Sequence, residues 1–207
     1  MDAYNSMIGG NFAQPLANAV HSLVRENRES VDSKVNERDT DWILTGILLS
    51  AVMFESHLRW THVHKYPNLN NKEGPDFYDY LRTKHPELPD VGEIFLLRNV
   101  IVHGHVWEIG APSASRRFLA KLLRGWKDQR WRRYVKDNAR VSKSGFNLPP
   151  SLMNRQDFRM ALNYVVGAMR ALANAELLLV QPLERRLIWP DGSGERIRLE
   201  ELVERIR

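Results

Sequence analysis

Apolar side chains recur every three or four residues along most of the chain, and this spacing limits the fold more than any other feature. In the segment 155–180 they fall on one face of a helix: Phe158, Leu162, Val165, Val166, Met169 and Leu172. Similar spacing predicts helices over about 12–28, 42–64 and 89–103, with a shorter one over 77–84. Stretches rich in Asn, Gly and Pro, at 67–75 and 141–150, read as loops. The sequence therefore predicts an all-α protein.

Capping and turn residues set the expected boundaries. Pro15 suits the first turn of the first helix, Thr40 and Asp41 offer N-caps for the helix over 42–64, and Asn154 caps the helix over 155–180. Near the C-terminus, 186–189 and 196–199 flank an Asp191-Gly192 turn and predict a small β-hairpin, followed by a short amphipathic helix. We expect a helical domain over 1–182 and a hairpin-plus-helix unit over 183–207.

The positive charge of the chain is concentrated in one segment. Lys and Arg total 30 against 25 Asp and Glu, but residues 116–143 alone hold eleven basic and two acidic side chains. Apolar residues at helical spacing predict a basic helical insertion here. One interpretation is a phosphate-binding face; the other is a solvated helix whose long side chains shield apolar surface. The first interpretation predicts RNA contacts from Arg116, Arg117, Lys121, Arg124, Lys127, Arg130, Arg132 and Arg133.

Composition excludes several classes of site. The chain has no cysteine, so disulfides, thiolate zinc sites, iron–sulfur clusters and cysteine nucleophiles are absent. No phosphate-binding glycine loop, dinucleotide fingerprint or zincin motif occurs, and neither His62/His64 nor His103/His105 has the spacing for joint metal ligation on one helix. We expect no metal and no cofactor. The longest apolar stretch is about a dozen residues and no signal peptide is evident, which predicts a soluble, cytoplasmic protein without membrane contact.

The helix over 89–103 carries three polar side chains, Arg98, Asn99 and His103, and ends at Gly104. At about 100° per residue, Asn99 and His103 share a face, whereas Arg98 lies about 140° from His103. Arg98 can bind a phosphate through two hydrogen bonds, Asn99 can orient a ribose or phosphate oxygen, and His103 can transfer a proton. The alternative is structural: Arg98 pairs with an acid, Asn99 is exposed and His103 caps the helix.

Arg98-Asn99-x3-His103-Gly104 at the end of an apolar helix resembles the motif of the HEPN superfamily (higher eukaryotes and prokaryotes nucleotide-binding). The resemblance implies an antiparallel helical bundle and a homodimer whose paired motif helices form one site. Many members are metal-independent RNA endonucleases of toxin, antiphage and RNA-processing systems. By this resemblance Arg98 stabilises the phosphate, His103 transfers protons and Asn99 positions the substrate.

Three further residues extend or qualify the resemblance. Glu93 fits the acidic position of an extended family motif, but Leu97 stands where that motif has Lys. Asp90 and Glu93 have capping-box spacing, so we expect Glu93 to cap the helix rather than act in catalysis. Some toxins of the family that are controlled by a nucleotidyltransferase antitoxin have Tyr where this chain has His105, which is either an extra polar group at the site or a loop residue. Two interpretations of Glu55 stay open: a hydrogen bond to Arg98, since relatives often have acidic or polar residues on the equivalent helix, or a surface pair with Arg59.

These observations predict a metal-independent endoribonuclease of a bacterial toxin or antiphage system, active as a homodimer on RNA, with an antitoxin or defence protein as partner. Two alternatives stay open. One is a non-catalytic HEPN-like module for dimerisation or RNA binding. The other is a DNA-binding regulator that uses the basic segment, although no helix-turn-helix is recognisable.

Overall fold

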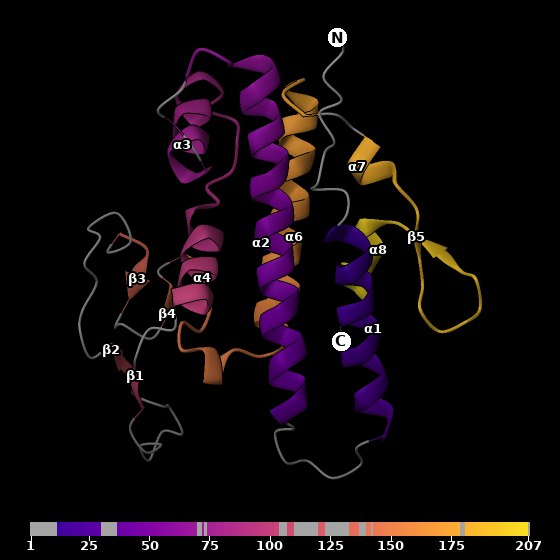
Figure 1. The fold of residues 1–207 in the computed structure, drawn as a ribbon. Helices are drawn as coiled ribbons and strands as arrows, with labels where there is room; N and C mark the ends of the chain where they lie inside the picture. The colour runs from indigo at the N-terminus through magenta and orange to yellow at the C-terminus, as the bar shows by residue number, and fades with distance from the viewer. Residues whose placement is uncertain are drawn as a thin grey trace.

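The computed structural model describes residues 12–29, 37–69, 72, 74–103, 107–109, 120–122, 133–136, 140–141, 143–178 and 181–206. Helices dominate this part of the chain, as Figure 1 shows. The α-helices are α1 (Ala13–Glu29), α2 (Glu37–Lys65), α3 (Gly74–Lys84), α4 (Gly92–His103), α6 (Arg155–Asn174), α7 (Gln181–Glu184) and α8 (Leu199–Arg205). A 3-10 turn, η2 (Pro150–Leu152), precedes α6. The predicted all-α fold is confirmed.

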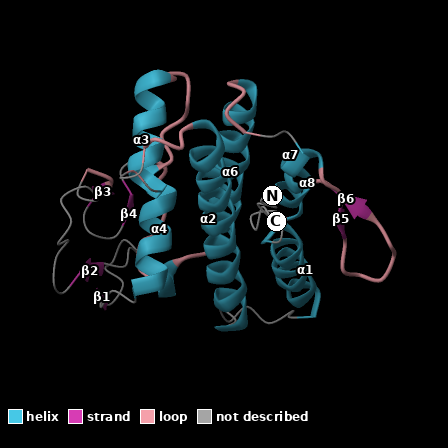
Figure 2. Cartoon of the chain, turned by 45° about the horizontal axis from the view of Figure 1, so that its top comes forward, coloured by secondary structure: helices cyan, strands magenta, loops and turns pink. Residues whose placement is uncertain are grey.

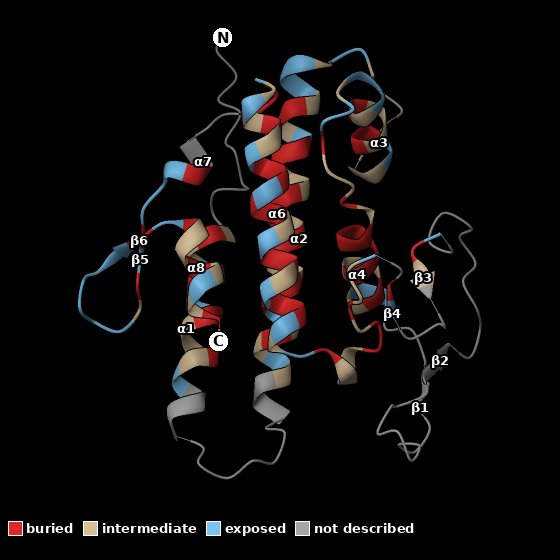
Figure 3. Cartoon of the chain, turned by 180° about the vertical axis from the view of Figure 1, so that it is seen from behind, coloured by how far each residue is buried: buried red, intermediate tan, exposed pale blue. Residues whose placement is uncertain are grey.

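Helix α2 is the centre of the bundle and contacts α1, α3, α4 and α6 (Figures 1 and 2). α1 and α2 run in opposite directions (Figure 1). α2 and α6 run in the same direction, as two contacts show. Gly46, in the first half of α2, lies against Phe158 near the start of α6. Toward their ends, the Thr61 hydroxyl donates a hydrogen bond of 2.8 Å to the Leu177 carbonyl. Figure 3 shows the buried residues concentrated along the faces where these helices meet.

The start of α2 differs from the prediction. The helix begins at Glu37, so Thr40 and Asp41 lie inside it rather than at its N-cap. Residues with capping side chains are also tolerated in the first turn, where backbone N–H groups have no acceptor within the helix. The other expected N-cap is confirmed: the Asn154 side chain accepts hydrogen bonds from the backbone N–H groups of Gln156 and Asp157. α6 ends at Asn174, six residues before the predicted end.

The prediction of a helix over 116–143 is wrong for the part of this segment that the structure describes. Short strands take its place: β2 (Ala120–Leu122) pairs antiparallel with β1 (Trp107–Ile109), and β3 (Val135–Lys136) pairs antiparallel with β4 (Arg140–Val141). Apolar periodicity over short runs does not separate helix from strand, and pairing with another strand decided the outcome. Several of the predicted RNA-binding residues lie outside the described residues: Arg116, Arg117, Arg124, Lys127, Arg130 and Arg132. Lys121 lies in β2.

The predicted C-terminal hairpin and helix are present. β5 (Leu187–Ile188) pairs with β6 (Arg196–Ile197) across the Asp191-Gly192 turn, where Gly192 has φ 82°. This unit packs on the bundle through contacts of α8 with α1 and α6 and of β5 with α1. The Gln14 side chain donates to the Ile188 carbonyl at 2.7 Å and accepts from the Ile188 N–H at 3.0 Å. Within the described part of the chain, no helix has the length and apolar content to span a bilayer.

Candidate functional site

The motif helix α4 leaves the core halfway along its length. Its first half is fully enclosed, since the residues from Glu93 to Leu97 are all buried. From Arg98 onward the helix reaches the surface, with Val100 as the buried exception. Val102 is 51% exposed and His103 is exposed in the last turn. The apolar half therefore anchors the helix while the half that carries the motif faces outward.

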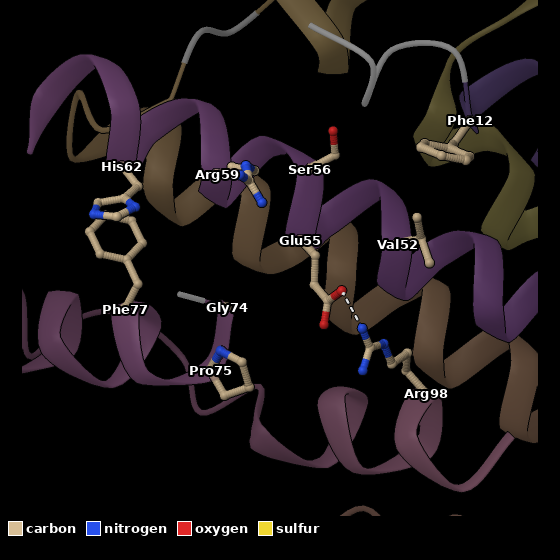
Figure 4. Close-up of a pocket in the computed structure, with 10 residues that line it drawn as sticks. All are labelled: Phe12, Val52, Glu55, Ser56, Arg59, His62, Gly74, Pro75, Phe77 and Arg98. Carbon is tan, nitrogen blue, oxygen red and sulfur yellow. Dashed lines mark ion pairs between the residues drawn. The ribbon is translucent and has the colours of Figure 1, made fainter. Parts of the chain in front are cut away.

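Arg98 forms an ion pair with Glu55 of α2. Nη2 of Arg98 lies 3.3 Å from Oε2 of Glu55, and the two side chains are 36% and 21% exposed. Burial raises the pKa of Glu55 above its ordinary value, and the Arg98 guanidinium opposes this by a smaller amount. Of the two partners considered for Glu55, Arg98 is the one that the structure shows. Figure 4 shows the two side chains directed toward each other across the gap between α2 and α4.

The ion pair lies in a cleft of about 450 Å³ that α2, α3 and α4 form together. One stripe of α2 supplies half of its lining: Val52, Glu55, Ser56, Arg59 and His62. The start of α3, residue Phe12 and Arg98 complete the wall (Figure 4). A volume of this size falls in the range of small-molecule sites, about 300–1,000 Å³. The cleft is therefore large enough for a nucleotide-sized ligand.

Asn99 and His103 do not share this cleft with Arg98. Of the three motif residues, Arg98 alone is among the described residues that line it. Asn99 is half-buried and His103 is exposed, one helical turn apart on α4. Arg98 points about 140° away from His103 around the helix axis. A single copy of α4 thus presents the arginine to the cleft and the histidine to the outside.

Glu93 has a structural role that differs from the predicted one. Its two carboxylate oxygens accept hydrogen bonds from the backbone N–H groups of Lys143, at 2.8 Å, and Ser144, at 3.1 Å. The capping-box prediction for Glu93 is wrong, because both carboxylate oxygens bind backbone N–H groups of a turn fifty residues further along the chain. Asp90 accepts from the Gly92 N–H at 3.1 Å and pairs with the Lys143 ammonium at 2.6 Å. These two acids fasten the end of the basic segment to the start of α4.

Two predicted site residues remain, His105 and Arg133. His105 lies outside the described residues. Arg133 is exposed, with its guanidinium 3.2 Å from Asp79 and stacked 4.7 Å over the Tyr134 ring. An arginine held by α3 in this way is less available to RNA than the sequence suggests. The RNA-binding role of the basic segment stays a prediction.

Sequence reasoning overlooked Ser56, Arg59 and His62 as parts of the site. The Nε2 atom of His62 hydrogen-bonds the Leu69 carbonyl at 2.7 Å, and its ring lies 4.7 Å from that of Phe77. The signal was available, since Glu55, Arg59 and His62 recur at helical spacing along α2. His57, on the same helix, is fully buried, and burial lowers its pKa.

No group of three or more His, Asp or Glu side chains that could hold a metal ion occurs among the described residues. Comparisons with known protein families, with curated proteins and with solved structures find no match to the chain.

Proposed function

We propose that this protein is a metal-independent endoribonuclease of the HEPN type. The observation that carries the proposal is the form of α4: a buried apolar half holds the helix, and the emerging half bears Arg98, Asn99 and His103. Arg98 is kept in place by Glu55 rather than free in solvent. Catalytic groups need such support, because small losses of alignment cost large factors in rate.

The site is formed between two copies of the chain. Arg98 and His103 point apart on one helix, so two facing α4 helices bring the arginine of one copy near the histidine of the other. Val102, which lies between them on the exposed part of the helix, is 51% exposed and offers apolar surface for this contact. The homodimer is therefore part of the proposal.

The reaction is an intramolecular transesterification at a phosphodiester bond of RNA. His103 of one copy takes the proton of a ribose 2′-hydroxyl, and the 2′-oxygen forms a bond to the adjacent phosphorus. The bond from phosphorus to the 5′-oxygen breaks, and that oxygen receives a proton from His103 of the second copy. Arg98 stabilises the negative charge that builds up on the phosphate oxygens. The products are a 2′,3′-cyclic phosphate and a 5′-hydroxyl.

The biological setting is inferred from the same resemblance. We place the enzyme in the bacterial cytoplasm, as a toxin or an antiphage effector with an antitoxin or defence protein as partner. The basic segment 116–143 supplies charge that attracts the RNA backbone.

The test is RNA cleavage by purified protein in EDTA. His103→Ala and Arg98→Ala should each lower the rate by about 100-fold or more, because general acid–base and charge-stabilising groups contribute on this scale. The control is His85→Ala, since His85 follows α3 and pairs with Glu87. All variants should keep the wild-type circular dichroism spectrum and dimer mass. Absence of cleavage by wild type, or equal cleavage by His103→Ala, rejects the nuclease; RNA binding without cleavage favours the non-catalytic module.

A further inference from the structure

The cleft beside Arg98 contains a carboxylate, Glu55, that is paired at one of its two oxygens. Glu55 is 21% exposed, and its partner among the described residues is Arg98, which reaches one oxygen, Oε2. The second oxygen, Oε1, has no donor within the described part of the chain. A partly desolvated carboxylate gains from further N–H donors, because each oxygen can accept two hydrogen bonds. Glu55 is therefore suited to receive donors from a ligand.

The cleft also contains a guanidinium that is available to an anion. Arg59 lies one turn beyond Glu55 on α2, is exposed, and forms no ion pair with any described residue. Glu55 neutralises one of the two arginines, so the described lining of the cleft keeps one net positive charge. Guanidinium groups bind phosphate oxygens through paired hydrogen bonds. A ligand of this cleft therefore combines N–H donors at one end with a phosphate at the other.

Among RNA bases, guanine fits the carboxylate best. Its N1–H and N2–H donors lie side by side on one edge, so one carboxylate can accept both. Adenine and cytosine place an amino group beside a ring acceptor, and uracil places one N–H between two carbonyls. In those three bases an acceptor would face the carboxylate oxygens. The apolar lining from Phe12, Val52 and Pro75 suits the faces of a planar base (Figure 4).

We propose that the cleft between α2, α3 and α4 is a guanine-nucleotide site, in which Glu55 accepts N1–H and N2–H and Arg59 binds the phosphate. The site deepens the proposed function, since it names the base that the ribonuclease reads next to Arg98. Free nucleotide and RNA share this chemistry. Cleavage of RNA on one side of guanosine is the expected result for RNA, and binding of mononucleotide alone is the expected result for a nucleotide ligand.

The experiment is calorimetric titration of the purified chain with 5′-GMP, IMP, AMP and guanosine. GMP should bind about tenfold or more tighter than AMP, since AMP turns an acceptor toward the carboxylate. IMP, which lacks the N2 amino group, should fall between them. This series uses wild-type protein, so it does not depend on the folding of any variant. Equal binding of GMP and AMP, or no binding of either at millimolar concentration, overturns the proposal.

Two variants separate the roles of the residues. Glu55→Gln should abolish the preference for GMP over AMP. Arg59→Ala should weaken GMP but leave guanosine unchanged, because guanosine has no phosphate. The matched control is Arg159→Ala, an exposed arginine of α6 outside the cleft lining. An unchanged GMP preference in Glu55→Gln, or equal weakening of GMP and guanosine by Arg59→Ala, contradicts the assignment.

These measurements also distinguish the two proposals from each other. Nucleotide binding is measured without RNA, so a guanine preference in a protein that does not cleave RNA supports the cleft and rejects the nuclease. Cleavage at all four nucleotides, together with equal binding of GMP and AMP, supports the nuclease and rejects the cleft.

Discussion

Asp157 joins the start of α6 to the segment before it. The carboxylate accepts hydrogen bonds from the backbone N–H and the side-chain amide of Asn147, at 3.1 and 2.8 Å, and from the Asn154 N–H at 2.9 Å. Burial raises the pKa of Asp157, and these hydrogen bonds oppose the increase. One side chain thus serves both as the reciprocal half of a capping box and as an anchor for residues 147–154.

Replacing Asp157 by Ala should lower the free energy of unfolding by about 2–4 kcal/mol, because the N–H groups of residues 147 and 154 lose their acceptor and the helix loses the reciprocal half of its capping box. Urea denaturation at pH 7 measures the change. Gln156→Ala, an exposed substitution in the same helical turn, should stay within about 0.5 kcal/mol of wild type. Equal midpoints for the two variants would contradict the assigned role.

The pH dependence of this difference has a definite sign. A raised pKa means that the folded protein binds the Asp157 proton more tightly than the unfolded chain does. The difference between wild type and Asp157→Ala should therefore widen as the pH falls from 7 toward the ordinary aspartate pKa of 3.8. A difference that narrows over this range would show that the hydrogen bonds outweigh burial.

Residue-level prediction from the sequence succeeded where the decisive contacts were local. The Asn154 cap uses N–H groups two and three residues away, so its pattern is visible in the sequence. Glu93 has the same kind of spacing, but its carboxylate oxygens accept hydrogen bonds from the backbone N–H groups of Lys143 and Ser144. The sequence does not show that this turn lies beside Glu93. The Glu55–Arg98 pair was foreseen as one of two alternatives. The contribution of Arg59 to the cleft was not.

At the scale of elements, the crossing of α2 and α6 depends on a glycine. A Cβ at position 46 would lie 2.1 Å from Cζ of Phe158, so the Phe158 ring occupies the space that any side chain would need. Glycine within a helix costs about 0.5–1 kcal/mol relative to Ala. The close approach of the two helices explains why this position is glycine.

Gly46→Ala should destabilise the protein by about 1–3 kcal/mol, because the methyl group forces the Phe158 ring or the helices to move. Gly167→Ala is the matched control: its Cβ meets nothing within 4 Å on the exposed face of α6. That substitution should stabilise the fold by about 0.5–1 kcal/mol. Thermal unfolding of both variants measures this. Phe158→Leu added to Gly46→Ala should cost less than the two single changes together.

The elements that the sequence predicted well are those whose apolar stripe is long. α6 and α2 each offer many turns of consistent spacing, so helix is the state that buries their apolar residues. Between 104 and 142 the apolar runs are short, and β1 and β2 form because each supplies hydrogen bonds to the other. Pairing between Trp107 and Leu122 depends on a chain path that local periodicity does not encode.

At the scale of the whole molecule, the proposed enzyme needs two copies. Exposed large apolar side chains are few among the described residues: Val63, Val102 and Ile188. Val102 lies next to His103 on α4, where the proposed dimer brings two motif helices together. Val63 is exposed to a similar degree on α2, which makes it a close match in size and exposure.

Val102→Lys should shift the protein from dimer to monomer and remove most RNA cleavage, because it places two like charges in an apolar contact. Light scattering coupled to size-exclusion chromatography measures the mass, and cleavage in EDTA measures activity. Val63→Lys should leave both unchanged. A wild-type monomer, or a Val102→Lys dimer with full activity, would contradict the paired-helix site.

The hydrogen bonds between Gln14 and Ile188 join positions 174 residues apart. On the ribosome, at about 5–20 residues per second, Ile188 is made roughly 10–35 s after Gln14. During that interval α1 lacks its contacts with β5 and α8, and the face of α1 that later packs against them is not covered by them. The rate of translation therefore determines how long the nascent chain exposes this surface to chaperones and to other nascent proteins.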